Sequence, residues 1–380
     1  MTRREWLTMI GAAPLVHAAV PDDPPLPPAS PVSITRCASY DEDVTAAVAK
    51  LFDQLGGLDG LVRNKTVTIK VNMTGSPGNR LKGLAPALTH YVHPKVLGAT
   101  AYLMGRAGAR RIRFAESPWA TTGPLEEVML DSGWNVRALQ SAAPGVEFAN
   151  TNFIGKNKTY ARFAVPGGPA AAYMYPAYDL NRAYEETDVF VSLAKLKNHA
   201  TCGVTLSLKN SFGCLPASVY GDDSGVDEPN EKPASGRSAV GHDGKRQPSK
   251  SAPQELNFGA NRDAGYRVPR IVVDLAAARP IQFAIVDGVQ SVAGGEGPWI
   301  RDLRVVQPGV LMAGLNAVCT DAAATAVMGY DPRAMRGAAP FRTCDNTLLL
   351  AEARGLGTAD LKRIEVRGLS IAEALYRYDG

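Results

Sequence analysis

Short apolar segments rich in β-branched residues alternate along the chain with longer segments of helical periodicity. The run from Asp188 to Leu196 is almost continuously apolar, as expected for a strand buried on both faces. The alternation predicts an α/β fold with a mostly parallel central sheet flanked by helices. The strands are expected within 31–39, 65–73, 109–117, 188–196, 281–292, 309–316 and 362–368, and the helices within 43–55, 94–108, 123–132, 269–280, 317–328 and 346–357.

Three segments stand outside this alternation. Residues 1–19 carry Arg3 and Arg4 before a weakly apolar run that ends in small residues, a layout that resembles a twin-arginine signal peptide. Residues 20–31 are rich in proline and are expected to form an extended linker before one α/β domain at 32–380. Residues 217–265 are dense in Gly, Ser, Asp, Pro and Lys, and are expected to be a long polar loop, either a lid or a surface insertion.

Charge and hydropathy exclude some partners. The net charge of +4 is too small to indicate nucleic-acid binding, and basic runs are not interleaved with aromatic residues. Because no apolar run reaches about 18 residues, no stable membrane anchor is expected. Since twin-arginine signals are read by an export machinery, we expect an exported protein, periplasmic or extracellular after signal cleavage.

Polar residues follow the predicted strands, where open α/β sheets bind their ligands. Lys70 and Asn72 follow the second strand, and Glu116 and Ser117 follow the third. The remaining strand ends supply further candidates for binding a cofactor or an anion, namely Lys195, Lys197, Asp287 and, after a Gly-rich turn, Glu296. Asn316 and Asp321 follow the strand at 309–316, so five polar strand ends are expected to face one crevice.

Histidines and one lysine add chemistry to this crevice. His93, His199 and His242 could together ligate a transition metal, or His93 and His199 could act as acid and base. For any one of them the alternative is a hydrogen-bonded cap or a surface residue, which is the more frequent role of a lone histidine. Lys209 lies in an otherwise apolar stretch, where it could be a nucleophile, an anion-binding charge or a side chain that reaches solvent.

The cysteines argue against metal clusters. The chain has five, at positions 37, 202, 214, 319 and 344, with no C-x-x-C pair. Most are expected to be small buried hydrophobic residues, and a bridge between Cys202 and Cys214 is one alternative in an oxidising compartment.

Several motifs in order resemble those of domain-of-unknown-function family 362. They are Thr66 to Asn72, His93–Pro94, Lys195 to Gly213, Ile285 to Trp299 and Val318 to Pro332, and the resemblance covers roughly Ile34 to Gly368. No activity comes with that family. Lys209 and the histidines also resemble, faintly, the cofactor segment of nickel-pincer lactate racemases, in which a lysine holds the cofactor and histidines ligate nickel.

These observations predict an exported α/β enzyme acting on a small anionic molecule, with a racemase or epimerase of a hydroxy or sugar acid as its sharpest form. Lys209, His199 and His93 would be catalytic. The alternative is a periplasmic ligand-binding or cofactor-maturation protein without turnover.

Overall fold

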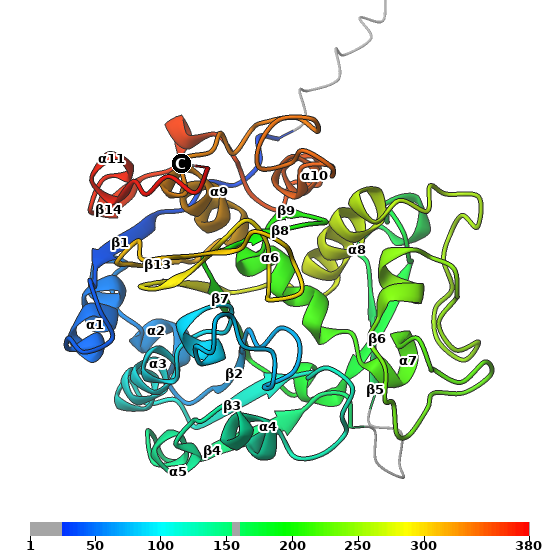
Figure 1. Ribbon diagram of the computed structural model, residues 1–380, viewed down its shortest axis with the longest axis horizontal. Helices are drawn as coiled ribbons and strands as arrows, with labels where there is room; N and C mark the ends of the chain where they lie inside the picture. The colour runs from blue at the N-terminus through cyan, green and yellow to red at the C-terminus, as the bar shows by residue number, and fades with distance from the viewer. Residues whose placement is uncertain (1–24, 154–159, 380) are drawn as a thin grey trace, which may run out of the picture.

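A central sheet of eight strands organises the computed structural model, which describes residues 25–153 and 160–379 (Figure 1). The strands lie in the order β14 (Val366–Gly368), β1 (Val32–Arg36), β13 (Val310–Gly314), β10 (Phe283–Gly288), β7 (Val189–Lys195), β2 (Thr66–Lys70), β3 (Arg111–Glu116) and β4 (Val146–Asn150). Five of the seven neighbouring pairs are parallel, which confirms the predicted sheet.

Strand β13 runs antiparallel to both of its neighbours, β1 and β10. Its carboxyl end therefore lies at the opposite edge of the sheet from the carboxyl ends of β2, β3, β7 and β10. The expectation that Asn316 joins the other strand ends in one crevice is wrong for this reason. Asn316 instead caps the helix that follows, by accepting the backbone N–H of Cys319.

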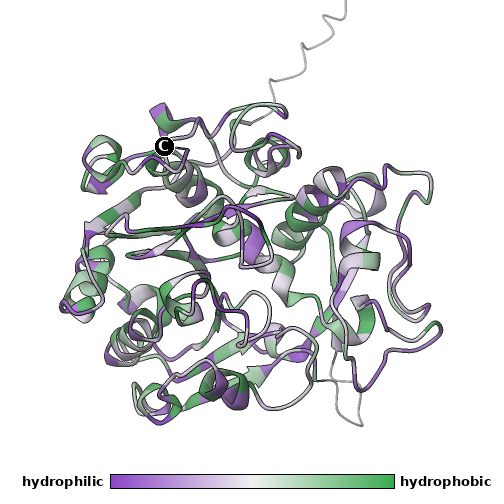
Figure 2. Ribbon diagram, in the orientation of Figure 1, coloured by the Kyte–Doolittle hydropathy of each residue, from purple (hydrophilic) through white to green (hydrophobic). Residues whose placement is uncertain are grey.

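The two faces of the sheet bury separate apolar clusters, because successive side chains of a strand point to opposite faces. Val189, Val191 and Leu193 of β7 join one cluster, whereas Phe190 joins the other. The first cluster is covered by α1 (Val44–Gln54), α2 (Asp59–Val62), α3 (Pro94–Arg106), α4 (Leu125–Asp131) and α5 (Val136–Gln140). The second is covered by α6 (Leu206–Asn210), α8 (Ala264–Ala278), α9 (Ala317–Val327), α10 (Thr347–Ala353) and α11 (Ile371–Ala374). Apolar residues accordingly concentrate in the strands and on the helix faces turned toward them (Figure 2).

Smaller elements complete the fold. The remaining strands pair in three short ribbons, β5 (Tyr160–Ala164) with β6 (Ala177–Asn181), β8 (Asn198–His199) with β9 (Gly203–Val204), and β11 (Ser291–Ala293) with β12 (Arg304–Val306). The remaining helical turns are α7 (Ala217–Tyr220), η1 (Pro86–Leu88), η2 (Gly168–Ala170), η3 (Arg182–Tyr184), η4 (Ser211–Cys214), η5 (Ser238–His242) and η6 (Leu361–Arg363). The single strand expected at 281–292 is divided into β10 and β11, with Val289 and Gln290 between them.

The polar segment 217–265 is packed against the body of the protein. The Glu255 carboxylate lies 2.7 Å from the Arg267 guanidinium of α8, and both side chains are fully buried. Arg262 pairs with the same carboxylate at 2.8 Å. Buried ion pairs of this kind hold a segment in one position, because separating them would leave a charge without a partner in a region of low dielectric constant. The segment forms a wall of the cavity described below.

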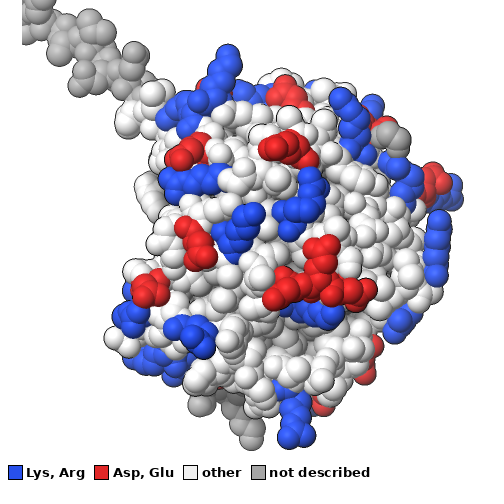
Figure 3. All heavy atoms as spheres, turned by 90° about the vertical axis from the view of Figure 1, so that its left-hand side faces the viewer, with Lys and Arg blue, Asp and Glu red and all other residues white. Residues whose placement is uncertain are grey.

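Residues 1–19, the expected signal peptide, lie outside the described residues, and the signal remains a prediction. Within the expected linker, the carbonyl of Pro27 accepts a hydrogen bond from Arg363 at 2.7 Å. In the part of the chain that the structure describes, no helix is both long and apolar enough to cross a membrane. The molecular face that carries the elements at the left of Figure 1 displays interspersed basic and acidic side chains (Figure 3).

Candidate functional site

A cavity of about 570 Å³ lies beyond the carboxyl ends of the central parallel strands. The last residues of β2 and β3, with those that follow them, form its floor, and α6 contributes Lys209. The polar segment 217–265 and the Gly-rich turn before Trp299 supply the remaining walls. The cavity therefore lies where parallel α/β sheets place their ligands.

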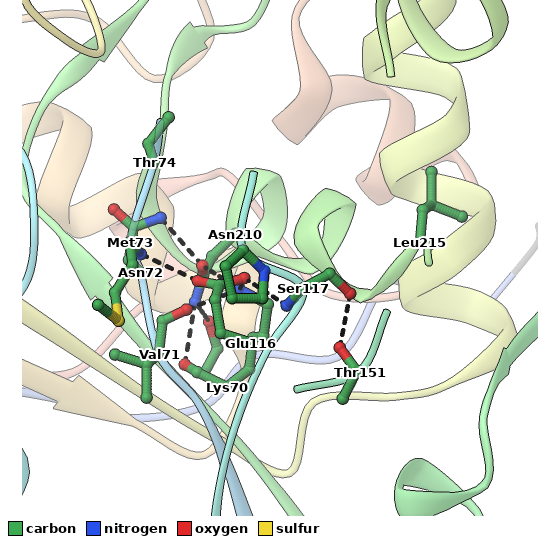
Figure 4. A network of polar contacts seen from close by, with 12 residues as sticks. Lys70, Val71, Asn72, Met73, Thr74, Glu116, Ser117, Thr151, Asn210 and Leu215 are labelled. Atoms are coloured by element: carbon green, nitrogen blue, oxygen red, sulfur yellow. Dashed lines mark hydrogen bonds and ion pairs between the residues drawn. The ribbon is translucent and has the colours of Figure 1, made fainter. Parts of the chain in front are cut away.

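The cavity floor is a network of buried polar groups (Figure 4). The Lys70 ammonium lies 2.6 Å from Glu116 Oε1 and donates to the Val71 carbonyl at 2.6 Å. The other carboxylate oxygen of Glu116 accepts the backbone N–H of Met73 at 2.9 Å. Lys70 thus has a carboxylate partner, and its charge is balanced within the protein.

Two asparagines connect this floor to α6. The Asn210 amide donates to the Lys70 carbonyl at 3.2 Å and to the Ser192 hydroxyl at 3.0 Å, so it fixes α6 to the end of β2 and the middle of β7. Asn72 donates to Asn210 Oδ1 at 3.0 Å. The carbonyl oxygen of the Asn72 side chain is buried without a hydrogen-bond partner in the described structure. Because a buried unpaired acceptor is costly, this atom is a candidate contact for a ligand hydroxyl or amine.

Helix α6 begins in an unusual backbone conformation. Leu206 has a φ of 45°, a left-handed value that a residue with a branched side chain rarely adopts. The buried carboxylate of Asp321 on α9 accepts the next two backbone N–H groups, those of Ser207 at 2.9 Å and Leu208 at 2.7 Å. Asp321 therefore holds the helix start that places Lys209 in the cavity.

Lys209 is a half-buried cation without a carboxylate partner. Its ammonium lies 4.3 Å from the centre of the Phe212 ring, and among the described residues it makes no hydrogen bond or ion pair. Burial lowers the pKa of Lys209 to about 8. The side chain is consequently charged in most molecules at pH 7 and is available to a ligand.

Arg237 is a second half-buried cation that lines the cavity. Its guanidinium donates to the carbonyls of Leu215 at 2.6 Å and Ser117 at 2.8 Å, and to Asn152 Oδ1 at 3.2 Å. No carboxylate of the described chain lies within ion-pairing distance of it. Burial lowers the pKa of Arg237, although an arginine remains charged throughout the ordinary pH range.

Two histidines lining the cavity hold opposite tautomers. His199 Nδ1 accepts the backbone N–H of Thr201 at 3.1 Å, so the proton of the neutral ring is on Nε2. His242 Nδ1 donates to the Arg237 carbonyl at 3.3 Å, so its Nε2 carries a lone pair. Burial, reinforced by the charge of Lys209, lowers the pKa of His242 to about 4 and that of His199 well below its usual value. At pH 7 the cavity therefore holds one neutral imidazole donor and one neutral imidazole acceptor.

Glu296 stands beside His199. One of its carboxylate oxygens accepts the backbone N–H of Ala200 at 2.9 Å, and the other accepts the indole N–H of Trp299 at 3.0 Å. Burial alone would raise the pKa of Glu296, but nearby His199 and these hydrogen bonds lower it to about 2. Lys197 supports this turn from behind by donating to the Glu296 carbonyl at 3.0 Å and the His90 carbonyl at 2.6 Å.

Several predicted site residues lie outside the cavity. The Lys195 ammonium and the Asp287 carboxylate form a fully buried ion pair at 2.9 Å, because their positions are directly opposed on parallel strands β7 and β10. Tyr40 donates to the same carboxylate at 2.7 Å. These groups, and Lys197 with its carbonyl partners, are structural supports rather than cavity-facing cofactor ligands.

His93 is a helix cap rather than a member of the site. Its Nδ1 accepts the backbone N–H of Lys95 at the start of α3, and its ring stacks on Tyr40 at 3.7 Å. The metal triad expected from His93, His199 and His242 is therefore not assembled. No cluster of three or more His, Cys, Asp or Glu side chains suited to a metal ion occurs within residues 25–153 and 160–379.

Sequence reasoning did not select Arg237, Trp119 or Trp299. Arg237 lies in the polar segment 217–265, whose composition gave no sign of which residues face the strand ends. Trp299 ends the Gly-rich turn at Glu296 and could have been selected as an aromatic residue next to a predicted site carboxylate. The expected alternative of a Cys202–Cys214 bridge is not formed, since both thiols are free and buried.

Comparisons with known proteins place the chain in a family. Residues 67–326 match the sequence pattern described as a domain of unknown function, DUF362. The thylakoid-associated protein sll1697 of Synechocystis sp. is 24% identical over 303 residues, which cover 79% of this chain and 75% of that protein. A crystal structure of a Thermotoga maritima protein shares 12% identity with a TM-score of 0.33, covering 72% of this chain and 56% of the other. The family match over residues 67–326 includes most strands of the sheet and all residues that line the cavity. The chain belongs to the DUF362 family.

Proposed function

We propose that this protein is an enzyme that binds a small anionic substrate in the cavity and moves a proton on it. The observation that carries the proposal is the pair of cations Lys209 and Arg237, which face one cavity without a carboxylate partner in the described chain. Removing a cation even partly from water is costly unless its charge is paired. An anionic ligand would supply the missing counter-charge for both groups.

The charge balance of the cavity supports an anion. Three cations line it, Lys70, Lys209 and Arg237, against two carboxylates, Glu116 and Glu296. One unit of positive charge is therefore left over at pH 7. A carboxylate or a phosphate group would neutralise it.

The two histidines supply complementary proton chemistry. The Nε2–H of His199 can hydrogen-bond an oxygen on which negative charge develops, as a neutral electrophile. The Nε2 lone pair of His242 can accept a proton. Because the charge of Lys209 depresses the pKa of His242, neutralisation of that charge by a bound anion would raise the basicity of His242. Binding of the anionic substrate would thus make His242 a stronger base toward that substrate.

Proton removal and return at a carbon next to a carboxylate is the reaction class that this set fits best. The proposed substrates are hydroxy acids or sugar acids, and the reaction is a racemisation or epimerisation. His242 would take the proton, and His199 would stabilise the oxyanion of the resulting enediolate. A solvent water on the opposite face would protonate the carbon and invert it, and the proton held by His242 would neutralise the hydroxide that this leaves.

A ligand-binding or cofactor-maturation protein without turnover is the second candidate. It is favoured by the low pKa of His242, which is a weak base in the absence of an anion, while Lys209 and Arg237 suffice for binding. Export is proposed for either function, since residues 1–19 resemble a twin-arginine signal and the Synechocystis relative carries a thylakoid-associated name.

Thermal unfolding tests anion binding. Sulfate, phosphate, lactate and gluconate are added in increasing concentration, since a ligand that binds only the folded state raises the melting temperature. We expect at least one anion to stabilise the wild type, a smaller effect in Lys209→Met and Arg237→Met, and an unchanged effect in the exposed control Lys50→Met. Stabilisation that is equal in all four proteins, or absent from all, would refute the proposal.

Solvent isotope exchange tests turnover. In deuterated water, proton NMR follows loss of the C–H signal next to the carboxylate of each stabilising hydroxy acid. We expect exchange by the wild type and none by His242→Ala, which should still bind the anion. Binding without exchange by the wild type would favour the second candidate.

A further inference from the structure

Two tryptophans at the cavity are exposed to an extent that is unusual for this residue. Trp119 is 52% exposed and Trp299 is 46% exposed, yet both line the cavity. Tryptophan is highly buried on average because its ring is large and apolar. An exposed indole that lines a cavity offers an aromatic face on which the ring of a ligand could stack.

The orientation of the Trp299 ring is fixed by a hydrogen bond and by close backbone contacts. Its indole N–H is fixed by the hydrogen bond to Glu296. Its six-membered ring lies against the backbone of Gly75 and Gly297, where an added Cβ would come within 2.6 Å and 2.3 Å of ring atoms. Any side chain at either glycine would displace the ring. One part of the ring is therefore packed on backbone, while nearly half of the side chain stays open.

The polar segment 217–265 packs against Trp119 through Gly236. An added Cβ at Gly236 would lie 3.1 Å from its indole nitrogen, and the next residue is Arg237. Trp119 and Arg237, whose guanidinium has no carboxylate partner in the described chain, therefore line the same cavity. The Trp119 ring contacts the backbone at Gly236, and the next residue along the chain carries the Arg237 guanidinium.

The size of the cavity agrees with a ligand larger than a simple anion. Its volume of about 570 Å³ falls inside the range of ~300–1,000 Å³ that is typical of clefts for ligands of drug size. The smallest hydroxy acids would occupy only a part of it. Space therefore remains for a ring beyond the anionic group.

We propose that the ligand of this cavity carries a planar ring that stacks on Trp299, with Trp119 as a second wall, and an anionic group held by Lys209 and Arg237. The inference rests on the proposed function, since it takes the anion-binding cations as given. It adds the substrate class: aromatic or heteroaromatic carboxylates or phosphates, in place of the smallest acids. Carboxylates and phosphates would both pair with these two cations, and the probes below distinguish them.

Matched probes that differ by a ring test the inference by titration calorimetry. The pairs are phenyl phosphate with methyl phosphate, mandelate with lactate, and adenosine 5′-phosphate with ribose 5-phosphate. Stacking of a ring on an aromatic side chain corresponds to a preference of about 5- to 150-fold. We expect at least one pair to show a preference in that range for the ring-bearing member. The pair that shows it identifies the anion as carboxylate or phosphate.

Variants of Trp299 separate stacking from a structural role. Trp299→Ala should remove the preference for the ring while leaving the affinity for the ringless partner within about twofold. Trp299→Phe, which keeps a ring but loses the hydrogen bond to Glu296, should retain most of the preference. Tyr102→Ala, which removes a comparably exposed ring of α3 outside the cavity, should change neither affinity.

Different results of these experiments would overturn ring recognition and anion binding. If ringless anions bind but no pair prefers its ring-bearing member, ring recognition is overturned while anion binding stands. Equal weakening of both members by Trp299→Ala would also overturn it, because the tryptophan would then act only through Glu296. If no anion of any pair binds, both proposals are overturned.

Discussion

The charge of Lys209 should make anion binding depend on pH between 7 and 9. Burial lowers the pKa of Lys209 to about 8, so the ammonium loses its proton within this interval. Replacement by arginine keeps a positive charge that does not titrate there, and replacement by methionine removes the charge at every pH. Anion binding should therefore depend on pH in the wild type and be independent of pH in both variants, with a lower affinity in Lys209→Met than in Lys209→Arg.

The magnitude follows from the fraction of charged side chain. With a pKa of about 8, about nine-tenths of the molecules carry a charged Lys209 at pH 7 and about one-tenth do so at pH 9. If an anion binds the charged form alone, its association constant should fall about tenfold between these values. A hydrogen bond to a charged group contributes ~1.5–3 kcal/mol, so Lys209→Met should weaken binding about 10- to 150-fold at pH 7.

Calorimetric titration with sulfate and lactate is the assay, because neither anion changes its own charge between pH 7 and 9. Arg237 stays charged over this range, and His199 and His242 stay neutral because their pKa values lie well below it. We expect a falling profile for wild type, and flat profiles for Lys209→Arg and Lys209→Met. A flat wild-type profile, or an equal slope in Lys209→Arg, would refute the assignment of the titrating group to Lys209.

Three further predictions concern the framework of the site. Burial raises the pKa of Asp321 to about 7, above its value in the unfolded chain, so its contribution to stability is complete below about pH 4 and is lost as the pH rises through about 7. The stability of wild type relative to Asp321→Asn, from urea unfolding, should therefore fall by up to about 4 kcal/mol from pH 4 to pH 8; a difference that does not vary with pH would contradict this. Arg267→Met should cost about 3–5 kcal/mol in the free energy of unfolding and expose the segment 217–265 to limited proteolysis, whereas Lys250→Met, which removes an exposed pair with Asp227, should cost less than about 1 kcal/mol and leave the segment resistant. The five cysteines are free and buried, with thiol pKa values raised by burial, so Ellman's reagent should detect no fast-reacting thiol in native protein and all five after unfolding; rapid labelling of the native state would argue against this core.

Local sequence predicted seven of the eight strands of the central sheet, β4 being missed, and the edge of the sheet at which the candidate site lies. The apolar run ending at Lys195 and the Pro94 start of α3 are read from neighbouring residues, because burial on both faces and helix capping leave short-range patterns. Lys70, Asn72 and Glu116 could be placed at the cavity because the carboxyl ends of parallel strands share one edge of a sheet. These residues needed only the direction of their own strands.

Tertiary structure decided which groups are free to act. Lys195 and Lys209 look alike in the sequence, yet the register of β7 with β10 pairs Lys195 with Asp287. Lys209, on α6, has no counter-charge among the residues that the structure describes. The antiparallel direction of β13, the capping role of His93 and the approach of Arg237 from a distant segment also depend on long-range packing. A strand register or the path of a long loop is set by the summed burial of many residues, so no short pattern around one residue can reveal whether its charge is paired.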